Sequence, residues 1–125
     1  HVFPYSMRTG TPAARMTDQI PEEEKHERVT KLLELNRELT MAYSKQFVGD
    51  VLEVIPERPF KDAPESGLLM GYSDNYLNVV FPGDESMIGK ICKVKLEQPG
   101  SEYCQGTFVR VVETEMLPYL KERAI

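Results

Sequence analysis

The feature that most constrains this chain is a series of short apolar runs between residues 47 and 113. The runs alternate apolar and polar side chains, and Gly, Pro, Asp, Asn and Ser residues separate them. Neighbouring side chains on a strand point to opposite faces, so this pattern is typical of short strands joined by turns. It predicts five strands, near residues 50–56, 67–72, 76–81, 88–97 and 106–112. Such strands favour a mainly β fold, a small five-stranded antiparallel barrel of the OB kind, because closure hides the edges of the sheet.

Alternation also assigns side chains to the inside or the outside of this barrel. The residues expected to face inward are Leu77, Val79, Phe81, Ile88, Cys92, Val94, Leu96, Val109 and Val111. The residues expected to face outward are Tyr76, Asn78, Ile91, Lys93, Lys95, Glu97, Phe108 and Arg110. Cations contact the phosphates of single-stranded RNA, and aromatic rings stack on its bases. Six of the outward residues therefore form a candidate RNA surface: Lys93, Lys95, Arg110, Tyr76, Asn78 and Phe108. An ordinary solvated barrel face is the alternative interpretation.

One long helix is predicted over residues 21–46. Pro21 suits the first helical position, and three glutamates follow it, where carboxylates favour the positive end of the helix dipole. We interpret these glutamates as a solvated, capping group rather than a metal site. Apolar side chains then recur at helical spacing, which predicts a stripe that packs against the core. The stripe consists of Val29, Leu32, Leu33, Leu39 and Tyr43.

The two ends of the chain are harder to interpret from residue types. Residues 1–20 are rich in loop signals, and Arg8 in such a loop suits a carboxylate or phosphate ligand as well as it suits solvent. Because the sequence starts at His1 within such a segment, we expect it to be part of a longer protein. A short helical turn is predicted from Met116 to Lys121 in the tail, although Pro118 weakens it.

Charge and cysteine content narrow the possible functions. The formal net charge of −5 argues against a nucleic-acid binder that depends on overall charge, but residues 90–95 hold three lysines and no acid. Cys92 and Cys104 form neither a CxxC nor a CxxxCxxC motif, so we expect no zinc or iron–sulfur cluster on this segment. We interpret Cys92 as a buried strand thiol, and nothing supports a disulfide. No apolar run approaches the length of about 18 residues that suggests a membrane span.

Several strings resemble one known family. The string His-Val-Phe-Pro-Tyr-Ser-Met-Arg-Thr-Gly-Thr-Pro-Ala at residues 1–13 resembles the end of the radical-SAM core of methylthiotransferases. The helix with Glu27-Arg28-Val29 and Leu32-Leu33 resembles the segment that follows it. Residues 46–113, with Gly71-Tyr72-Ser73-Asp74-Asn75-Tyr76, resemble the TRAM domain, a small β-barrel of tRNA-modifying enzymes. The resemblance is greatest to the MiaB/MtaB group, and within it to the threonylcarbamoyladenosine tRNA methylthiotransferase branch.

The resemblance implies an activity for a longer protein. Full-length members methylthiolate N6-threonylcarbamoyladenosine next to the anticodon, with S-adenosyl-L-methionine and two 4Fe-4S clusters. The resemblance places the cluster-binding cysteines upstream, so we expect this fragment to bind no cofactor and to contain no catalytic residue. The implied partners are the anticodon stem-loop of tRNA and the upstream radical-SAM core, in a cytoplasmic protein. The implied organisation is the end of the core at 1–46, the TRAM barrel at 47–113 and a tail at 114–125.

Roles for individual residues follow from the resemblance as hypotheses. Tyr5, Arg8 and Thr11 are expected at the edge of a substrate or S-adenosylmethionine pocket, and sealing of the end of the core is the structural alternative. The expected RNA-binding residues are Lys90, Lys93, Lys95, Arg110, Tyr72 and Tyr76. Two other functions remain open. One is a stand-alone RNA-binding module, and the other is a docking domain that does not contact RNA, which the negative charge favours.

Overall fold

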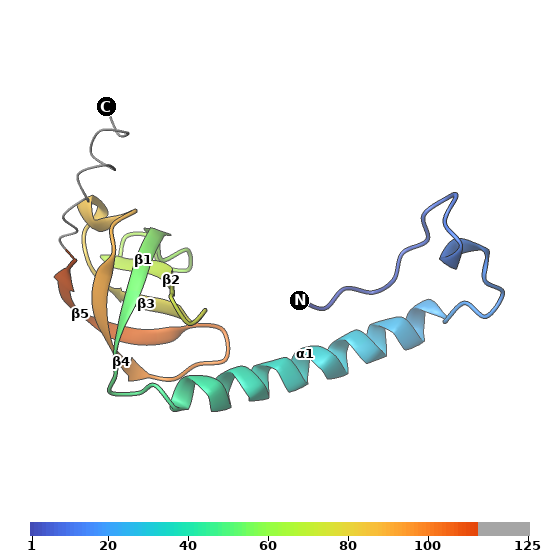
Figure 1. Ribbon diagram of the computed structural model, residues 1–125, viewed down its shortest axis with the longest axis horizontal. Helices are drawn as coiled ribbons and strands as arrows, with labels where there is room; N and C mark the ends of the chain where they lie inside the picture. Colours follow the sequence, from blue (N-terminus) through green and yellow to red (C-terminus); the bar gives the residue numbers. More distant parts are fainter. Residues whose placement is uncertain (113–125) are drawn as a thin grey trace, which may run out of the picture.

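A small barrel, one long helix and an N-terminal segment that turns back beside the helix make up the chain (Figure 1). The computed structural model describes residues 1–112, so the turn predicted at 116–121 and the rest of the predicted tail lie outside the described residues. The helix α1 spans Glu22–Lys45 and agrees with the predicted helix to within one residue at each end. The strands are β1 (Val51–Pro59), β2 (Leu68–Ser73), β3 (Asn78–Pro82), β4 (Cys92–Gln98) and β5 (Cys104–Val111).

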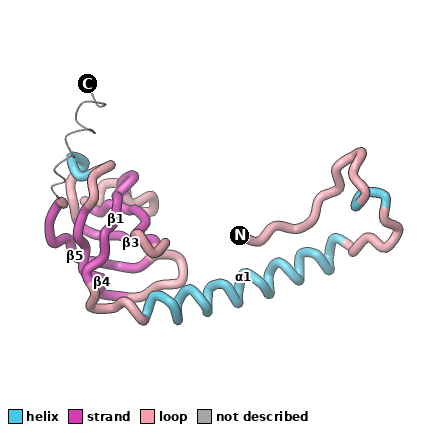
Figure 2. The backbone as a smooth tube through the Cα atoms, viewed as in Figure 1, coloured by secondary structure: helices cyan, strands magenta, loops and turns pink. Residues whose placement is uncertain are grey.

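The five strands close into a barrel in the order β1-β2-β3-β5-β4, which confirms the predicted fold class. The strands gather in one body at the C-terminal end of α1 (Figure 2). Four of the strand pairs are antiparallel. The fifth pair, β3 with β5, is parallel and consists of two residue pairs, a feature that alternation along single strands does not reveal. Closure leaves no long unpaired strand edge among the described residues, as expected for a small barrel.

Two predicted strand boundaries were wrong. Strand β1 continues to Pro59, beyond the predicted end near residue 56. Strand β4 begins at Cys92 and not near residue 88, because a 3₁₀ turn (η2, Glu85–Met87) and Gly89, with a φ of +83°, come before it. A positive φ interrupts an extended strand and favours glycine. Ile88 therefore lies outside the strand, although it still packs against the core.

The core fills the inside of the barrel with side chains from all five strands. Val54, Leu69, Phe81 and Leu96 are almost completely buried. Cys92 and Cys104 lie in the same cluster as free thiols, which confirms the interpretation of Cys92 as a buried strand thiol. A second, smaller cluster of Phe60, Met70 and Val80 packs elsewhere in the barrel, and Phe60 meets Tyr103 edge to face at 5.0 Å between ring centroids.

The predicted faces of β5 were wrong at two residues. Cys92 pairs with Val111 and Lys93 with Arg110, but Val94 pairs with Phe108, so Val109 is an extra residue in the ladder. Such a bulge shifts the alternation by one position. As a result, Phe108 packs against the core and Val109 is 51% exposed, the reverse of the expectation. Val111 packs against the core as expected.

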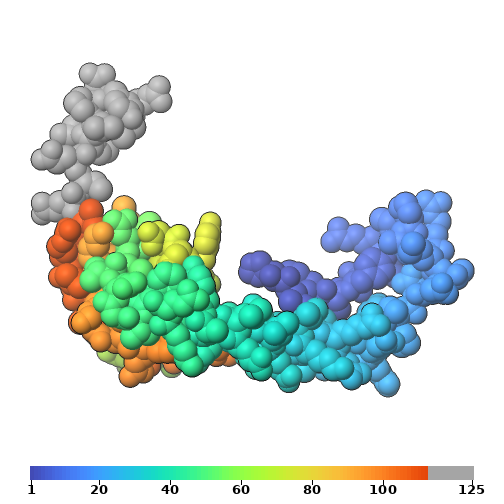
Figure 3. Space-filling view, turned by 60° about the horizontal axis from the view of Figure 1, so that its bottom comes forward, coloured from blue at the N-terminus to red at the C-terminus, as the bar shows by residue number. Residues whose placement is uncertain are grey.

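The apolar stripe of α1 does not pack against the barrel core, contrary to expectation. The helix leaves the barrel as an arm, attached by its C-terminal end (Figure 3). In this arm Leu32, Leu33 and Leu39 are exposed, and Leu39 is 60% exposed. Attachment comes from the buried Ser44, whose Oγ accepts a hydrogen bond from the Gly100 N–H at 3.2 Å, and from the Tyr43 hydroxyl, which donates to the Asn75 carbonyl at 3.2 Å.

Candidate nucleic-acid interface

A short basic strip runs over the outer face of β4 and β5. The register pairs Lys93 with Arg110 across the two strands, and Lys95 lies two residues further along β4 on the same face. The Lys95 and Arg110 side chains are exposed, whereas Lys93 is half-buried and its Nζ lies 2.9 Å from Glu53 Oε1 on β1. The strip therefore brings together three of the predicted RNA-binding residues. One of its charges is partly neutralised by a neighbouring carboxylate.

Lys90 lies apart from this strip, in the loop that precedes β4. Its backbone N–H donates to the Met87 carbonyl at 3.0 Å, which continues the turn formed by η2. Hydrogen bonds from Ser86 lower the pKa of Asp84 below its usual value, and the charge of Lys90 adds a smaller effect in the same direction. Lys90 is exposed, and the Asp84 carboxylate is near enough to be affected by its charge. This environment makes it a weaker candidate for phosphate binding than Lys95.

Tyr72 lies on the far side of β1 from the basic strip. It pairs with Ile55 on β1 and with Asn78 on β3, and its ring is 53% exposed. Strand β1 separates β2 from β4, so about two strand spacings, or about 10 Å, lie between this ring and the strip. A small hollow of 130 Å³ between them is lined by residues that include Glu53, Ile55 and Tyr72. The aromatic and basic groups therefore share one side of the barrel without touching.

Tyr76 stands at the tip of the β2–β3 hairpin. The Ser73 N–H donates to the Leu77 carbonyl at 2.8 Å, and the Leu77 N–H donates to the Ser73 Oγ at 2.9 Å, so residues 74–76 form a three-residue loop. Tyr76 has a φ of +65° and an exposed fraction of 88%. Its ring therefore makes little contact with the rest of the described chain. The predicted outward orientation of Tyr76 is confirmed.

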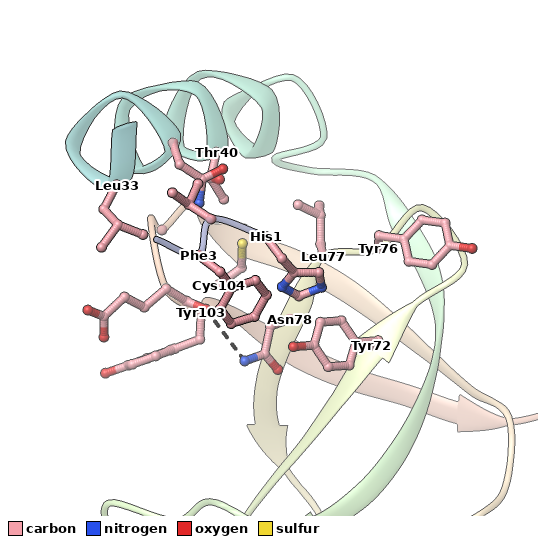
Figure 4. A pocket seen from close by; sticks show the side chains of 14 residues that line it. His1, Phe3, Leu33, Thr40, Tyr72, Tyr76, Leu77, Asn78, Tyr103 and Cys104 are labelled. Atoms are coloured by element: carbon pink, nitrogen blue, oxygen red, sulfur yellow. Dashed lines mark hydrogen bonds between the residues drawn. The ribbon is translucent and has the colours of Figure 1, made fainter. Parts of the chain in front are cut away.

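A groove of 460 Å³ lies between the barrel and α1 (Figure 4). The helix contributes Leu33, Asn36 and Thr40 to its wall, and the N-terminal segment contributes His1 to Phe3. Tyr72 and Asn78 point into the groove from the barrel, whereas Tyr76 stands at its rim with its ring turned outward (Figure 4). Asn78 belongs to the predicted outward surface, but the helical residues were not among the predicted site residues. Sequence alone offers no signal for them, because the groove depends on how the helix meets the barrel.

The amide of Asn78 is the least satisfied polar group of this groove. Its Nδ2 donates to the Glu102 carbonyl at 3.4 Å, which fixes the orientation of the amide. Its Oδ1 is shielded from solvent and has no hydrogen-bond partner among residues 1–112. Buried polar atoms are nearly always hydrogen-bonded, so an acceptor without a donor needs an explanation.

The residues predicted at the edge of a substrate pocket lie together at the other end of the molecule. Tyr5, Arg8 and Thr11 line one open hollow of 670 Å³ in the N-terminal segment. Thr11 has a local structural role, since its Oγ1 donates to the Arg8 carbonyl at 2.7 Å and accepts from the Ala14 N–H at 3.3 Å. The Tyr5 ring lies 5.5 Å from Lys25 Nζ, and Arg8 forms no ion pair with the described residues.

The described residues do not suit an iron–sulfur cluster. Residues 1–112 contain no group of three or more His, Cys, Asp or Glu side chains able to hold a metal ion. Burial raises the pKa of the Cys92 and Cys104 thiols, which disfavours the thiolate that ligates iron. Within the same residues, the structure also contains no helix long and apolar enough to span a membrane.

Comparison with known proteins places this barrel in a family. The TRAM domain matches residues 45–109, which include all of β1 to β4 and most of β5. The chain belongs to the TRAM domain family, a conclusion that agrees with the closed five-stranded barrel.

The chain is also similar to named tRNA methylthiotransferases. It is 53% identical over 121 residues to threonylcarbamoyladenosine tRNA methylthiotransferase MtaB of Bacillus subtilis, with 97% of this chain and 27% of that protein covered. It is 36% identical over 107 residues to tRNA-2-methylthio-N(6)-dimethylallyladenosine synthase of Carboxydothermus hydrogenoformans, with 86% of this chain and 24% of that protein covered. The predicted resemblance to the MiaB/MtaB group is confirmed. The chain spans about a quarter of the length of these curated relatives.

Proposed function

We propose that this chain is the tRNA-contacting part of an enzyme that methylthiolates N6-threonylcarbamoyladenosine next to the anticodon. The observation that carries the proposal is the basic strip of Lys93, Lys95 and Arg110 on a TRAM barrel, with exposed tyrosines on the same side. The identity of 53% to MtaB supports the threonylcarbamoyladenosine branch. The anticodon stem-loop is the part of tRNA that presents such an adenosine, so it is the proposed ligand.

The proposed division of labour follows the organisation of the chain. Residues 1–46 would complete a radical-SAM core, residues 47–113 would form the RNA-binding barrel, and residues 114–125 would form a tail. Tyr5, Arg8 and Thr11 share one hollow, which supports their proposed place at the edge of the substrate or S-adenosylmethionine pocket. The two 4Fe-4S clusters and S-adenosylmethionine would be bound by residues outside this chain, in a cytoplasmic enzyme.

The physical role proposed for the barrel is to hold RNA by its phosphates. Each phosphate that a lysine or arginine neutralises releases counterions, so affinity falls as salt rises. With a formal net charge of −5, the chain as a whole repels RNA, and binding must depend on the local strip. We therefore expect weak binding by this chain alone, strongest at low ionic strength.

Removal of two cations from the strip tests this proposal. A Lys93→Ala, Lys95→Ala variant should bind an anticodon stem-loop RNA roughly tenfold more weakly at low salt. Its plot of log K against log salt should flatten by about 1.4 to 1.8, because two phosphate contacts are lost. Fluorescence anisotropy of a labelled RNA over a range of salt concentrations measures both quantities.

A matched variant controls for overall charge. Lys31→Ala, Lys61→Ala also removes two exposed lysines and changes the net charge from −5 to −7, but it leaves the strip intact. It should keep the slope of the wild-type chain. Equal affinity and equal slope for the strip variant and the wild type would exclude the strip as the RNA contact.

A docking domain that does not contact RNA is the second candidate. Two observations favour it: the net charge of −5, and the leucines of α1, which remain exposed although Leu32 and Leu33 line hollows with the N-terminal segment. It predicts no salt-sensitive complex between this chain and the stem-loop. A stand-alone RNA module fits less well, because the helical arm and the N-terminal segment lie outside the barrel.

A further inference from the structure

The groove between α1 and the β2–β3 hairpin has the features of a base-binding site. We infer that it receives one unstacked base of single-stranded RNA, with Tyr72 as the stacking surface, Asn78 as the hydrogen-bonding group and Tyr76 as a second stacking surface at the rim. The inference rests on the proposed function, since it assumes that the barrel contacts RNA. The barrel would then contact RNA in two ways, through phosphates at the basic strip and through one base in the groove.

The backbone of Tyr76 is the first argument. A three-residue hairpin loop ends in a residue with left-handed backbone, a position that glycine usually fills. Tyr76 occupies it with a φ of +65°, although bulky side chains rarely adopt that conformation. Its ring is 88% exposed, so packing does not compensate for the strain. Strain of this kind persists at functional sites, and here it projects an aromatic ring into solvent beside the groove.

The chemistry of the groove wall is the second argument. Tyr72 and Asn78 are register partners on β2 and β3, and both point into the groove (Figure 4). The Oδ1 of Asn78 is shielded from solvent and has no donor among the described residues, and a base that displaces its cover would supply one from its amino or imino N–H groups. An aromatic ring beside an amide is a combination that recognises unstacked bases in RNA-binding proteins.

The charge of the groove is the third argument. None of the described residues that line it is a lysine or an arginine, and Glu102 contributes a carboxylate. The Glu102 carboxylate is paired with Arg37 at 3.9 Å, and His1 is the basic residue of the lining, so the groove lacks the cluster of lysines and arginines that phosphates need, whereas a neutral base does not need one. The basic strip lies about two β-strand spacings away from Tyr72. The phosphates and the bases of one RNA strand would therefore bind at separate sites on the barrel. Bases in a duplex are stacked and paired, so the groove selects a single strand.

The decisive substitution is Tyr76→Gly. Glycine suits a φ of +65°, so the substitution removes the ring without disturbing the hairpin. We expect an unchanged or higher melting temperature, together with an affinity for an oligoadenylate of about eight nucleotides that is roughly 5-fold to 150-fold lower. Tyr72→Ala should weaken binding in the same range. Neither variant should change the salt slope, because stacking releases no counterions from phosphates.

A fluorescent variant gives an independent measurement. The chain contains no tryptophan, so Tyr76→Trp introduces a single indole at the rim of the groove. Stacking of a base on this indole should quench its emission when oligoadenylate is added, and a fully paired RNA duplex should quench it much less. Leu39→Trp is the matched control, because it places a single indole at an exposed position of α1 that does not line the groove.

The possible outcomes separate this inference from the proposed function. If Tyr76→Gly and Tyr72→Ala bind oligoadenylate like the wild type while the Lys93, Lys95 variant binds more weakly, the base site is wrong and the RNA-binding barrel stands. Equal quenching of the Trp variant by duplex and by single strand would also reject the base site. Absence of any salt-sensitive RNA complex with the wild-type chain rejects both proposals.

Discussion

Cys92 and Cys104 are free thiols inside the barrel, and their burial makes them sensitive probes of its stability. Burial raises the pKa of both thiols in the folded chain, and for Cys104 the hydrogen bonds with Ser44 and Gly100 oppose this shift only in part. In the unfolded chain both thiols return to the ordinary value near 8.5. The two states therefore bind different numbers of protons at alkaline pH.

The free energy of unfolding should fall as pH rises above about 8.5. In that range the unfolded chain releases thiol protons that the folded chain retains, so deprotonation favours unfolding. Below that pH the thiols are protonated in both states and contribute no pH dependence. Urea unfolding at pH 7 and pH 10 measures the effect. A Cys92→Ala, Cys104→Ala variant should lose less stability over this interval than the wild type, and an equal loss in both would contradict the assignment.

Gly71 is a second residue whose role is set by close packing. A Cβ at this position would lie 2.1 Å from the Ile55 carbonyl oxygen and 2.7 Å from the Pro56 Cα, both on the backbone of β1. We expect Gly71→Ala to lower the free energy of unfolding by about 1–3 kcal/mol, since β1 and β2 would have to move apart. Chemical denaturation followed by circular dichroism measures this. Wild-type stability in Gly71→Ala would mean that the two strands do not approach this closely.

At the scale of elements, the junction between α1 and the barrel matters most. The helix extends for about 36 Å, and polar contacts at its last turn help hold it to the barrel. The buried Ser44 meets Gly100 there, and a Cβ on Gly100 would lie 1.7 Å from the Tyr103 carbonyl oxygen, which shows how tightly the loop before β5 is folded. This junction positions the helical wall of the groove relative to Tyr72 and Asn78.

Ser44→Ala should therefore destabilise the chain. The Gly100 N–H would lose its acceptor inside the junction, at a cost of about 1–3 kcal/mol in the free energy of unfolding. Ser66→Ala is the control, because its hydroxyl bonds the Ala63 carbonyl at an exposed site, where a change within about 0.5 kcal/mol is expected. Equal unfolding midpoints for the two variants would show that the junction does not depend on Ser44.

At the scale of the whole molecule, the arrangement of charges is compatible with the proposed RNA-binding role of an acidic chain. The formal net charge is −5, yet Lys93, Lys95 and Arg110 lie together on one face. The exposed tyrosines extend the same side toward α1. Overall repulsion combined with a local group of cations agrees with the proposed function, in which RNA binding depends on the strip alone.

Local patterns in the sequence were sufficient for the barrel and the helix. Apolar alternation and turn residues located all five strands, and helical spacing located α1, because both signals depend on neighbours within a few positions. The pairing of Lys93 with Arg110 could not be predicted from such local patterns. It depends on strand order and on the bulge at Val109, which also reversed the expected faces of Phe108 and Val109.

The groove and the exposed helix depended on contacts between distant parts of the chain. Asn36, Thr40 and Asn78 line one groove because the end of α1 is held against the barrel, where Ser44 contacts the loop at Gly100. The same geometry places the leucine stripe away from the barrel core, although its periodicity predicted packing against that core. Periodicity specifies which side of an element is apolar, but the partner of that side is set by three-dimensional packing, which no short stretch of sequence encodes.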